Sequence, residues 1–382
     1  MKITDVTTIR LRAAIPAEGQ VFSRSGVRRT RSTTLIRVET DEGIHGVGSA
    51  SGNGELIEFI IGRVLKPLLI GMDPTDIASI WDIAYLRGGH KEFGTRGIGV
   101  VALSGVDVAL WDILGKVQQK PLYQLLGGRV RDRVPVYATA LYPEEPSEVA
   151  RRARAFADQG FHGVKIKVGF DLDQDIRMVR AVRQELGRDF VVMTDANQGY
   201  SLEIGVEAAQ GFADAGAYWL EEPFFVEDIE SHAILRKKSR TPIAVGENLH
   251  TAHAFENFIL RAAVDFVQPD VARAGGISEV RKVAALADRH GIPVSFHTWG
   301  DAVALATSVH LAAAIENCIV MELDYTCNPL RDELLCEPLL LRKGYLVPPD
   351  SPGLGIELNS AALERFAFCG AEDLAVRQRV LT

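Results

Sequence analysis

The sequence lacks the features of a secreted, membrane or nucleic-acid-binding protein. Its 382 residues include 4 cysteines, none in CxxC spacing, so neither a disulfide framework nor a zinc site is expected. The net charge is −8 and no basic tail or stripe occurs, which argues against nucleic acid. No run of 18 apolar residues predicts a membrane span, and the N-terminus has no apolar signal segment. We therefore expect a cytoplasmic protein with a small-molecule partner.

A phosphate-binding glycine loop is also absent. Gly43, Gly46 and Gly48 do not follow the GxGxxG register. They lie in "TTLIRVETDEGIHGVGSA", which reads as two strands joined by a turn at Asp41-Glu42-Gly43, so a β-hairpin is favoured.

What the sequence does contain changes in pattern along the chain. Residues 1–125 mix strand and helix patterns, and 47% hydrophobic residues overall can fill a large core. From about residue 134, eight short apolar runs alternate with helical stretches, which predicts an α/β fold with a parallel TIM-type barrel over 126–330. Residues 331–382 are loop-rich and are expected to return to the N-terminal unit. The eight runs are PVYATA, GVKIKVG, FVVMTDAN, YWLEEP, IAVGEN, DFVQPD, PVSFHT and IVMELD.

The second run, "GVKIKVG", carries two lysines on one face. In a strand, Lys165 and Lys167 share a side because successive side chains alternate. An edge strand with a solvated face is one interpretation. In a barrel strand, both amines would instead point into the interior, where charge is unfavourable unless a partner needs it.

An ionisable residue stands at the C-terminal end of nearly every run, and successive ones are 23 to 28 residues apart. Any one of them could be a solvated strand end. Because strand ends of a barrel converge on one mouth, the whole series predicts an active site. Its members are Lys167, Asp195, Glu221, Glu247, Asp270, His297 and Glu322.

Three of these residues predict a metal site. Asp195, Glu221 and Glu247 lie on consecutive strands, and three crowded carboxylates repel unless a cation joins them. A site with only oxygen ligands favours a hard ion, so we expect Mg²⁺, with Mn²⁺ as the alternative. An ion-pair network with the two lysines and Arg273 is the alternative, although it does not explain the strand-end positions.

The remaining members predict acid–base chemistry. Beside a cation and Lys165, the pKa of Lys167 should fall, which would make it a general base. Asp270 and His297 lie on adjacent strands, where the carboxylate would fix the imidazole tautomer. Glu322 would hydrogen-bond a substrate carboxylate if it is protonated.

These groups together suit removal of a proton α to a carboxylate, with the metal stabilising the resulting charge. We assign no role to the other histidines; His250 and His253, for instance, are expected on a helix surface.

The same motifs resemble the enolase superfamily, in the mandelate racemase subgroup. The resemblance runs from "LIRVETDEGIHGVG" through "VALWDILGK", "KIKVG", "DANQ", "LEEP", "GEN", "QPD", "GGI" and "SFHT" to "MELD". It implies an α+β capping domain on a (β/α)7β barrel. It also implies metal ligands at Asp195, Glu221 and Glu247, bases at Lys167 and at His297 paired with Asp270, and carboxylate partners at Lys165 and Glu322. Asn197 matches a substrate-side position.

The predicted lid departs from the apolar lid of mandelate racemase. "QVFSRSGVRRTRS" carries Arg24, Arg28, Arg29 and Arg31, and "GGHKEFG" adds His90. Such a lid fits a polyhydroxylated or dicarboxylic acid. We expect substrate contacts from Arg24, Arg29 and His90. Thr139 stands where the subgroup has a small hydroxyl, while the neighbouring Ala140 replaces a polar residue.

The favoured function is an Mg²⁺-dependent acid-sugar dehydratase acting on an aldonic or aldaric acid. A racemase or epimerase would use the same Lys167 and His297. Cycloisomerase chemistry is disfavoured because that subgroup has a lysine near the sixth strand, where "QPDVARAGG" offers Asp270 and Arg273. A non-catalytic barrel that binds a metal-chelated acid is the remaining alternative. We expect a homo-oligomer.

Overall fold

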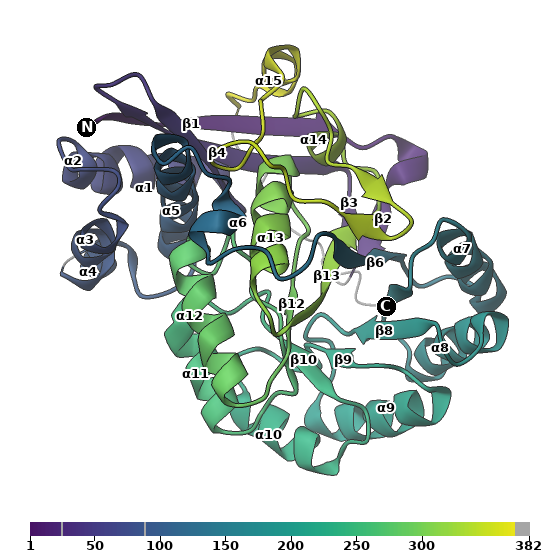
Figure 1. Ribbon diagram of the computed structural model, residues 1–382. Helices are drawn as coiled ribbons and strands as arrows, with labels where there is room; N and C mark the ends of the chain where they lie inside the picture. The colour runs from purple at the N-terminus through teal and green to yellow at the C-terminus, as the bar shows by residue number, and fades with distance from the viewer. Residues whose placement is uncertain (24–25, 88, 371–382) are drawn as a thin grey trace.

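The computed structural model describes residues 1–23, 26–87 and 89–370. It shows an α+β capping unit lying against the mouth side of a closed barrel (Figure 1). Arg24 of the predicted lid lies outside the described residues.

The capping unit is built on an antiparallel sheet in the order β1-β4-β5. The predicted hairpin is confirmed: β4 and β5 pair, and Gly43 in their turn has φ +77°, which favours glycine. The strands are β1 (Ile3–Ala14), β2 (Val21–Ser23), β3 (Gly26–Arg28), β4 (Thr30–Thr40) and β5 (His45–Ala50). The helices are η1 (Ala17–Gly19), α1 (Gly54–Ile60), η2 (Ile61–Leu65), α2 (Lys66–Leu69), α3 (Ile77–Trp81), η3 (Asp82–Leu86), α4 (Gly89–Phe93), α5 (Ile98–Val117) and α6 (Leu122–Leu125).

Helix α5 packs directly on β5, and two glycines permit the close approach. A Cβ on Gly46 or Gly48 would lie 2.0 Å from the carbonyl oxygen of Ala109 or Gly105. The glycines of this segment therefore serve helix–sheet packing. By length and apolar composition α5 alone among the described helices could cross a bilayer, but 89% of that window is buried inside the fold.

The barrel contains all eight predicted strands in sequential order, and β13 pairs in parallel with β6 to close it. The strands are β6 (Val134–Leu141), β7 (Gly163–Lys167), β8 (Val191–Asp195), β9 (Leu220–Glu221), β10 (Ile243–Val245), β11 (Phe266–Val267), β12 (Val294–Phe296) and β13 (Cys318–Asp324). The helices are α7 (Pro146–Asp158), α8 (Leu172–Leu186), α9 (Leu202–Ala215), α10 (Ile229–Lys238), α11 (Thr251–Leu260), α12 (Gly276–Arg289) and α13 (Ala302–Ala314).

Local signals explain where the barrel helices begin and end. Asp171, Ser201 and Asp301 are N-caps whose side chains accept backbone N–H groups in the first turns of α8, α9 and α13. Gly291 follows α12 with φ +65°, as the sequence predicts.

The last segment bridges the two units. Strand β15 (Tyr345–Leu346) pairs with β14 (Leu341–Arg342) and with the start of β6. After α14 (Pro329–Asp332) and α15 (Ser360–Phe366), Ala367 pairs with Leu11 of β1. Figure 1 shows this yellow segment beside the purple N-terminal strands.

Candidate active site

The two lysines of β7 point into the barrel, so the edge-strand interpretation is wrong. Strand β7 lies between β6 and β8, and Val164 and Ile166 are fully buried on its other face. Lys165 is 0% exposed and Lys167 9% exposed. Both amines therefore need partners inside the barrel.

Lys165 is the centre of a buried ion-pair network. Its Nζ lies 2.7 Å from Glu221 Oε1, 2.9 Å from Glu322 Oε1 and 3.5 Å from Asp195 Oδ2. Burial opposes its charge, but these carboxylates outweigh burial and hold the pKa of Lys165 well above its ordinary value. Lys165 is thus a fixed cation beneath the mouth.

Lys167 donates to Asp195 Oδ2 and is held against one of the predicted metal ligands. Burial lowers the pKa of Lys167, but the carboxylates of Asp195 and Glu247 together outweigh it, so that the protein's own charges raise the pKa. The predicted fall of this pKa applies to a protein with a divalent cation bound beside Lys167, and it stays a prediction. In this structure the nearest charge is negative.

The predicted metal ligands do converge. One carboxylate oxygen from each of Asp195, Glu221 and Glu247 lies within 4.8 Å of the others. Burial, followed by the charge of Asp195, raises the pKa of Glu221 to about 8. Buried carboxylates that crowd in this way fit a hard divalent cation, which relieves their repulsion and takes only oxygen ligands. The residues present therefore fit Mg²⁺.

Three further polar residues that sequence reasoning did not single out support this cluster. Gln268 Nε2 donates to Glu221 Oε2 at 2.7 Å, while Asn248 Nδ2 reaches Glu222 Oε2 at 2.7 Å and Glu247 Oε1 at 3.1 Å. Burial and the charge of Glu247 raise the pKa of Glu222 well above its ordinary value. Each of the three lies within two residues of a predicted strand-end residue, in "QPD", "GEN" or "LEEP". That closeness in the sequence could have identified them as part of the site.

His297 and Asp270 form the predicted pair. His297 Nδ1 lies 2.7 Å from Asp270 Oδ2, and Nε2 lies 2.9 Å from Glu247 Oε2. Burial opposes the imidazolium, but Glu322 and Glu247 outweigh it and raise the pKa of His297 well above its ordinary value. In this arrangement the imidazole is a proton donor.

Glu322 lies where the sequence predicts, but it is ionised. Burial would raise its pKa, yet Lys165 and His297 lower the pKa of Glu322 to about 2. The protonated form of Glu322 that the sequence analysis expects would require another negative charge nearby to raise its pKa again. Thr139 Oγ1 donates to Glu322 Oε1 at 2.6 Å and is itself fully buried, so Thr139 positions Glu322 and does not line the cavity.

The mouth opens into a cavity of about 900 Å³ beneath the β2–β3 hairpin. Asn197 lines it, and its backbone N–H donates to Asp195 Oδ1 at 2.9 Å. Arg29 lines it and is exposed, whereas Arg31 is buried and pairs with Asp324 at 2.8 Å. The predicted substrate-facing role thus fits Arg29, while Arg31 anchors the lid.

His90 is not among the residues that line this cavity, contrary to the prediction. Its Nδ1 lies 2.6 Å from the carbonyl oxygen of Tyr85, because the short helix α4 turns the ring onto the capping unit's own backbone.

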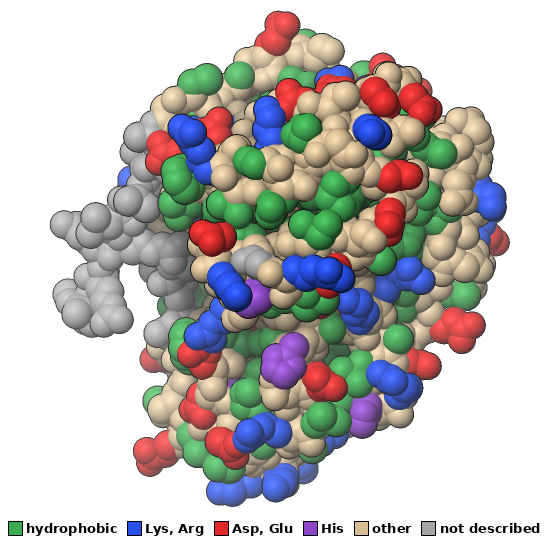
Figure 2. Space-filling view, turned by 90° about the vertical axis from the view of Figure 1, so that its left-hand side faces the viewer, with side chains coloured by type: hydrophobic (Ala, Val, Ile, Leu, Met, Phe, Trp, Pro, Cys, Tyr) green, Lys and Arg blue, Asp and Glu red, His purple; other side chains and the backbone are tan. Residues whose placement is uncertain are grey.

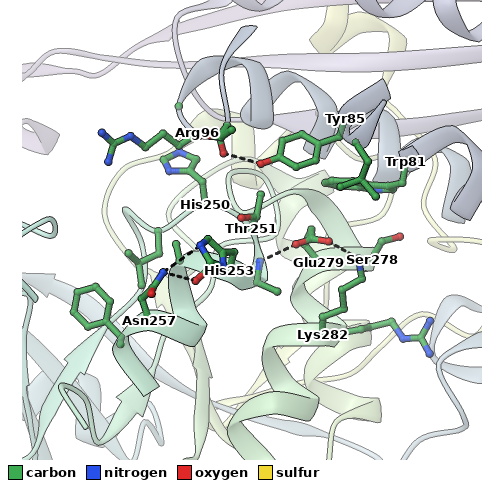
Figure 3. A pocket seen from close by; sticks show the side chains of 18 of the residues that line it. Trp81, Tyr85, Arg96, His250, Thr251, His253, Asn257, Ser278, Glu279 and Lys282 are labelled. Carbon is green, nitrogen blue, oxygen red and sulfur yellow. Dashed lines mark hydrogen bonds and ion pairs between the residues drawn. The ribbon is translucent and has the colours of Figure 1, made fainter. Parts of the chain in front are cut away.

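A second cavity, of about 1750 Å³, lies where the capping unit meets the barrel helices. Figure 2 faces this side of the molecule and shows it hollowed, with histidine side chains beside the hollow. In Figure 3, Trp81 and Tyr85 approach from the capping unit and His250 from the barrel. His250 is therefore half-buried in this cavity and not on an open helix surface, and burial lowers its pKa to about 4. His253 is exposed, as expected.

The fold is an α+β capping unit over a (β/α)7β barrel, and its site is a carboxylate triad between a lysine and a histidine. This combination is that of a barrel enzyme with a capping domain. The family comparisons agree. Residues 5–127 match the mandelate racemase / muconate lactonizing enzyme N-terminal domain, and residues 148–362 match the enolase C-terminal domain-like family. The chain belongs to the enolase superfamily, in the mandelate racemase subgroup.

The relatives of this chain include enzymes named as sugar-acid cycloisomerases and dehydratases. The chain is 36% identical to the D-galactarolactone cycloisomerase of Agrobacterium fabrum, over 96% of this chain and 99% of that protein. It is 35% identical to the arabinonate dehydratase of Saccharolobus solfataricus, over 86% and 89%. A crystal structure of an enolase-superfamily member from Polaromonas sp. JS666 matches with a TM-score of 0.91 and 34% identity, over 97% and 98%. The chain is accordingly an enzyme, a lyase or an isomerase.

Proposed function

We propose that this enzyme dehydrates an aldonic or aldaric acid to a 2-keto-3-deoxy acid. The α C–H bond breaks, its electron pair forms the Cα–Cβ double bond, and the β-hydroxyl leaves as water after protonation. The enol then takes up a proton at Cβ and loses its hydroxyl proton, which gives the 2-keto acid. The observation that carries the proposal is the placement of Lys167 and the His297–Asp270 pair on strands either side of the carboxylate triad.

Asp195, Glu221 and Glu247 would hold Mg²⁺, or Mn²⁺. Bound there, the cation would stabilise negative charge on the substrate carboxylate and, through its own charge, lower the pKa of Lys167.

The chain's own residues perform the proton transfers. Lys167 accepts the α-proton, and His297, held by Asp270, donates to the leaving hydroxyl. Lys165 supplies positive charge beneath the substrate carboxylate, with its Nζ held by Glu221 and Glu322. A carboxylate bound beside Glu322 raises the pKa of that residue, because like charges disfavour ionisation, and Glu322 then binds it as a donor.

Two isomerase alternatives use the same groups. A racemase or epimerase would deliver a proton from His297 to the face opposite Lys167. The cycloisomerase reaction, which the absence of a sixth-strand lysine disfavoured, becomes a second candidate because a relative of 36% identity bears that name. Opening a sugar-acid lactone by β-elimination would need the same base and acid. The non-catalytic alternative finds no support among these relatives.

We further propose that the protein acts as a homo-oligomer in the cytoplasm on a small carboxylic acid. Free Cys318, Cys327, Cys336 and Cys369 are compatible with a reducing compartment.

Screening a panel of aldonic acids, aldaric acids and their lactones with Mg²⁺ tests the proposal. A dehydratase forms a 2-keto acid from an open-chain acid. A lactone cycloisomerase consumes a lactone and leaves the open-chain acids unchanged, and a racemase exchanges the α-proton in D₂O without forming a keto acid. The absence of all three activities across the panel would refute the proposed class of reaction.

A further inference from the structure

We propose that Tyr142 and Trp299 bind hydroxyl oxygens on the part of the substrate beyond its reacting carbons, and so select a polyhydroxylated acid. This inference rests on the proposed function, because it names the class of substrate for the same site. Both residues line the active-site cavity together with Lys167 and His297.

Tyr142 presents a buried hydroxyl without a protein partner. It follows β6 directly and is 5% exposed, and among the described residues its Oη has no hydrogen-bond partner. Burial raises the pKa of Tyr142 to about 12, so the phenol stays neutral and can donate. A buried hydroxyl left unpaired is unfavourable, which makes its orientation toward a ligand the simplest explanation.

Trp299 presents a second donor of the same kind. Its Nε1 is buried and also lacks a partner within the described part of the chain. Two guanidinium groups stack on its ring, Arg28 at 4.3 Å and Arg31 at 4.1 Å from the centroid. Arg31 is in turn fixed by Asp324, so the indole N–H is held in place before any ligand binds.

The two donors lie on the same side of the barrel. Tyr142 follows β6 and Trp299 follows β12, and only β13 lies between those strands. The carboxylate triad stands on β8, β9 and after β10, on the other side. A substrate whose carboxylate lies at the triad would extend its remaining carbons toward Tyr142 and Trp299.

The chemistry of the donors selects the ligand. Both are neutral, and an indole N–H can only donate. Charged donors are the stronger partners for a second carboxylate, so neutral donors fit hydroxyl oxygens better. Sites with buried donors reject analogues that lack the matching oxygen, since the donors are then left unpaired.

Two six-carbon acids test this directly: galactarate, hydroxylated on all four inner carbons, and 2-hydroxyadipate, hydroxylated on one. Their binding to the Mg²⁺-loaded protein is measured by calorimetry in a Lys167→Ala background, which removes the proposed base and therefore turnover. We expect the background protein to prefer galactarate at least about tenfold. Tyr142→Phe should weaken galactarate binding about three- to tenfold and leave 2-hydroxyadipate unchanged. Trp299→Phe should act in the same direction.

Tyr137→Phe is the matched control. Tyr137 lies on β6 and, like Tyr142, has a buried hydroxyl with no protein partner among the described residues, but it packs against Trp219 and does not line the cavity. It should leave the affinity for both acids unchanged. Equal weakening of both acids by Tyr142→Phe, no weakening, or no preference in the background protein would each overturn the inference. Because binding is read without turnover, a failed dehydration assay leaves these results interpretable.

Discussion

His297 Nδ1 lies 2.7 Å from Asp270 Oδ2, and the residues come from adjacent strand ends of the barrel. Asp270 also accepts the backbone N–H of Ala272 at 2.8 Å, so its carboxylate is oriented before it meets the imidazole. The pair therefore fixes which ring nitrogen faces the cavity.

Asp270→Asn should lower kcat about 10²-fold while the fold is retained. The amide has the same shape but loses the charge that stabilises the imidazolium, so His297 becomes a weaker proton donor. The measurement is steady-state kinetics on whichever acid the screen identifies, with circular dichroism as the folding control. An unchanged kcat would remove Asp270 from the mechanism.

Chelation of divalent cations should abolish activity, and Mg²⁺ should restore it, because three crowded carboxylates need a cation. Added Mg²⁺ should also raise the Tm of the wild type, and Asp195→Asn or Glu247→Gln should abolish that rise. Glu230→Gln, an exposed surface variant, should keep it. Full activity in a rigorously metal-free preparation would contradict the assignment.

The lid arginines should separate into two kinds. Arg29→Ala should raise KM for a polar acid and leave the Tm unchanged, because Arg29 is exposed and lines the cavity. Arg31→Ala should destabilise the fold by about 3–5 kcal/mol, since it leaves buried Asp324 without its ion-pair partner. Urea unfolding and KM measurements on both variants check this. An Arg31→Ala variant with wild-type stability would show that the buried pair is not an anchor.

The free energy of unfolding should decrease in acid because buried His310 resists protonation in the folded protein. Tyr123 N donates to its Nδ1, its Nε2 donates to Leu354 O, and burial lowers the pKa of His310 to about 4 from an ordinary 6.5. Because the folded-state pKa is the lower one, this contribution is fully present above pH 6.5 and is lost as the pH falls toward 4. It amounts to about 3 kcal/mol.

His310→Gln, which keeps an acceptor and a donor but does not titrate, isolates the effect. The stability of the wild type relative to this variant should decrease by about 3 kcal/mol between pH 7 and pH 4 in urea unfolding. A difference that does not change with pH would mean that His310 does not titrate on unfolding.

The positions of the site residues could be predicted from the sequence because barrel topology converts chain spacing into convergence. Strand-end residues 23 to 28 apart had to meet at one mouth, and Asp195, Glu221 and Glu247 do. Their protonation could not be predicted in the same way. Whether the pKa of Lys167 or Glu322 rises or falls depends on which charge lies within a few ångströms, and spacing does not give that distance.

The positions of the lid side chains were also hard to predict from the sequence, because they depend on contacts with distant residues. Arg29 and Arg31 lie two residues apart on the same short segment, yet one is exposed at the cavity and the other is buried on Asp324. That difference depends on a partner almost 300 residues away in the sequence. Likewise, nothing in "GGHKEFG" reveals that the His90 ring is bound by the backbone of Tyr85.

The most direct test of the central claim is NMR-detected exchange of the substrate α-proton in D₂O, measured for the wild type, Lys167→Ala and His297→Asn beside a keto-acid assay. Lys167→Ala should eliminate exchange and turnover together, because the amine on β7 is the only proposed acceptor of that proton. His297→Asn should block loss of the β-hydroxyl and still permit exchange, since the base and the metal ligands remain. Exchange at the wild-type rate in Lys167→Ala would mean that the lysine pair of "GVKIKVG" is structural and would contradict the mechanism.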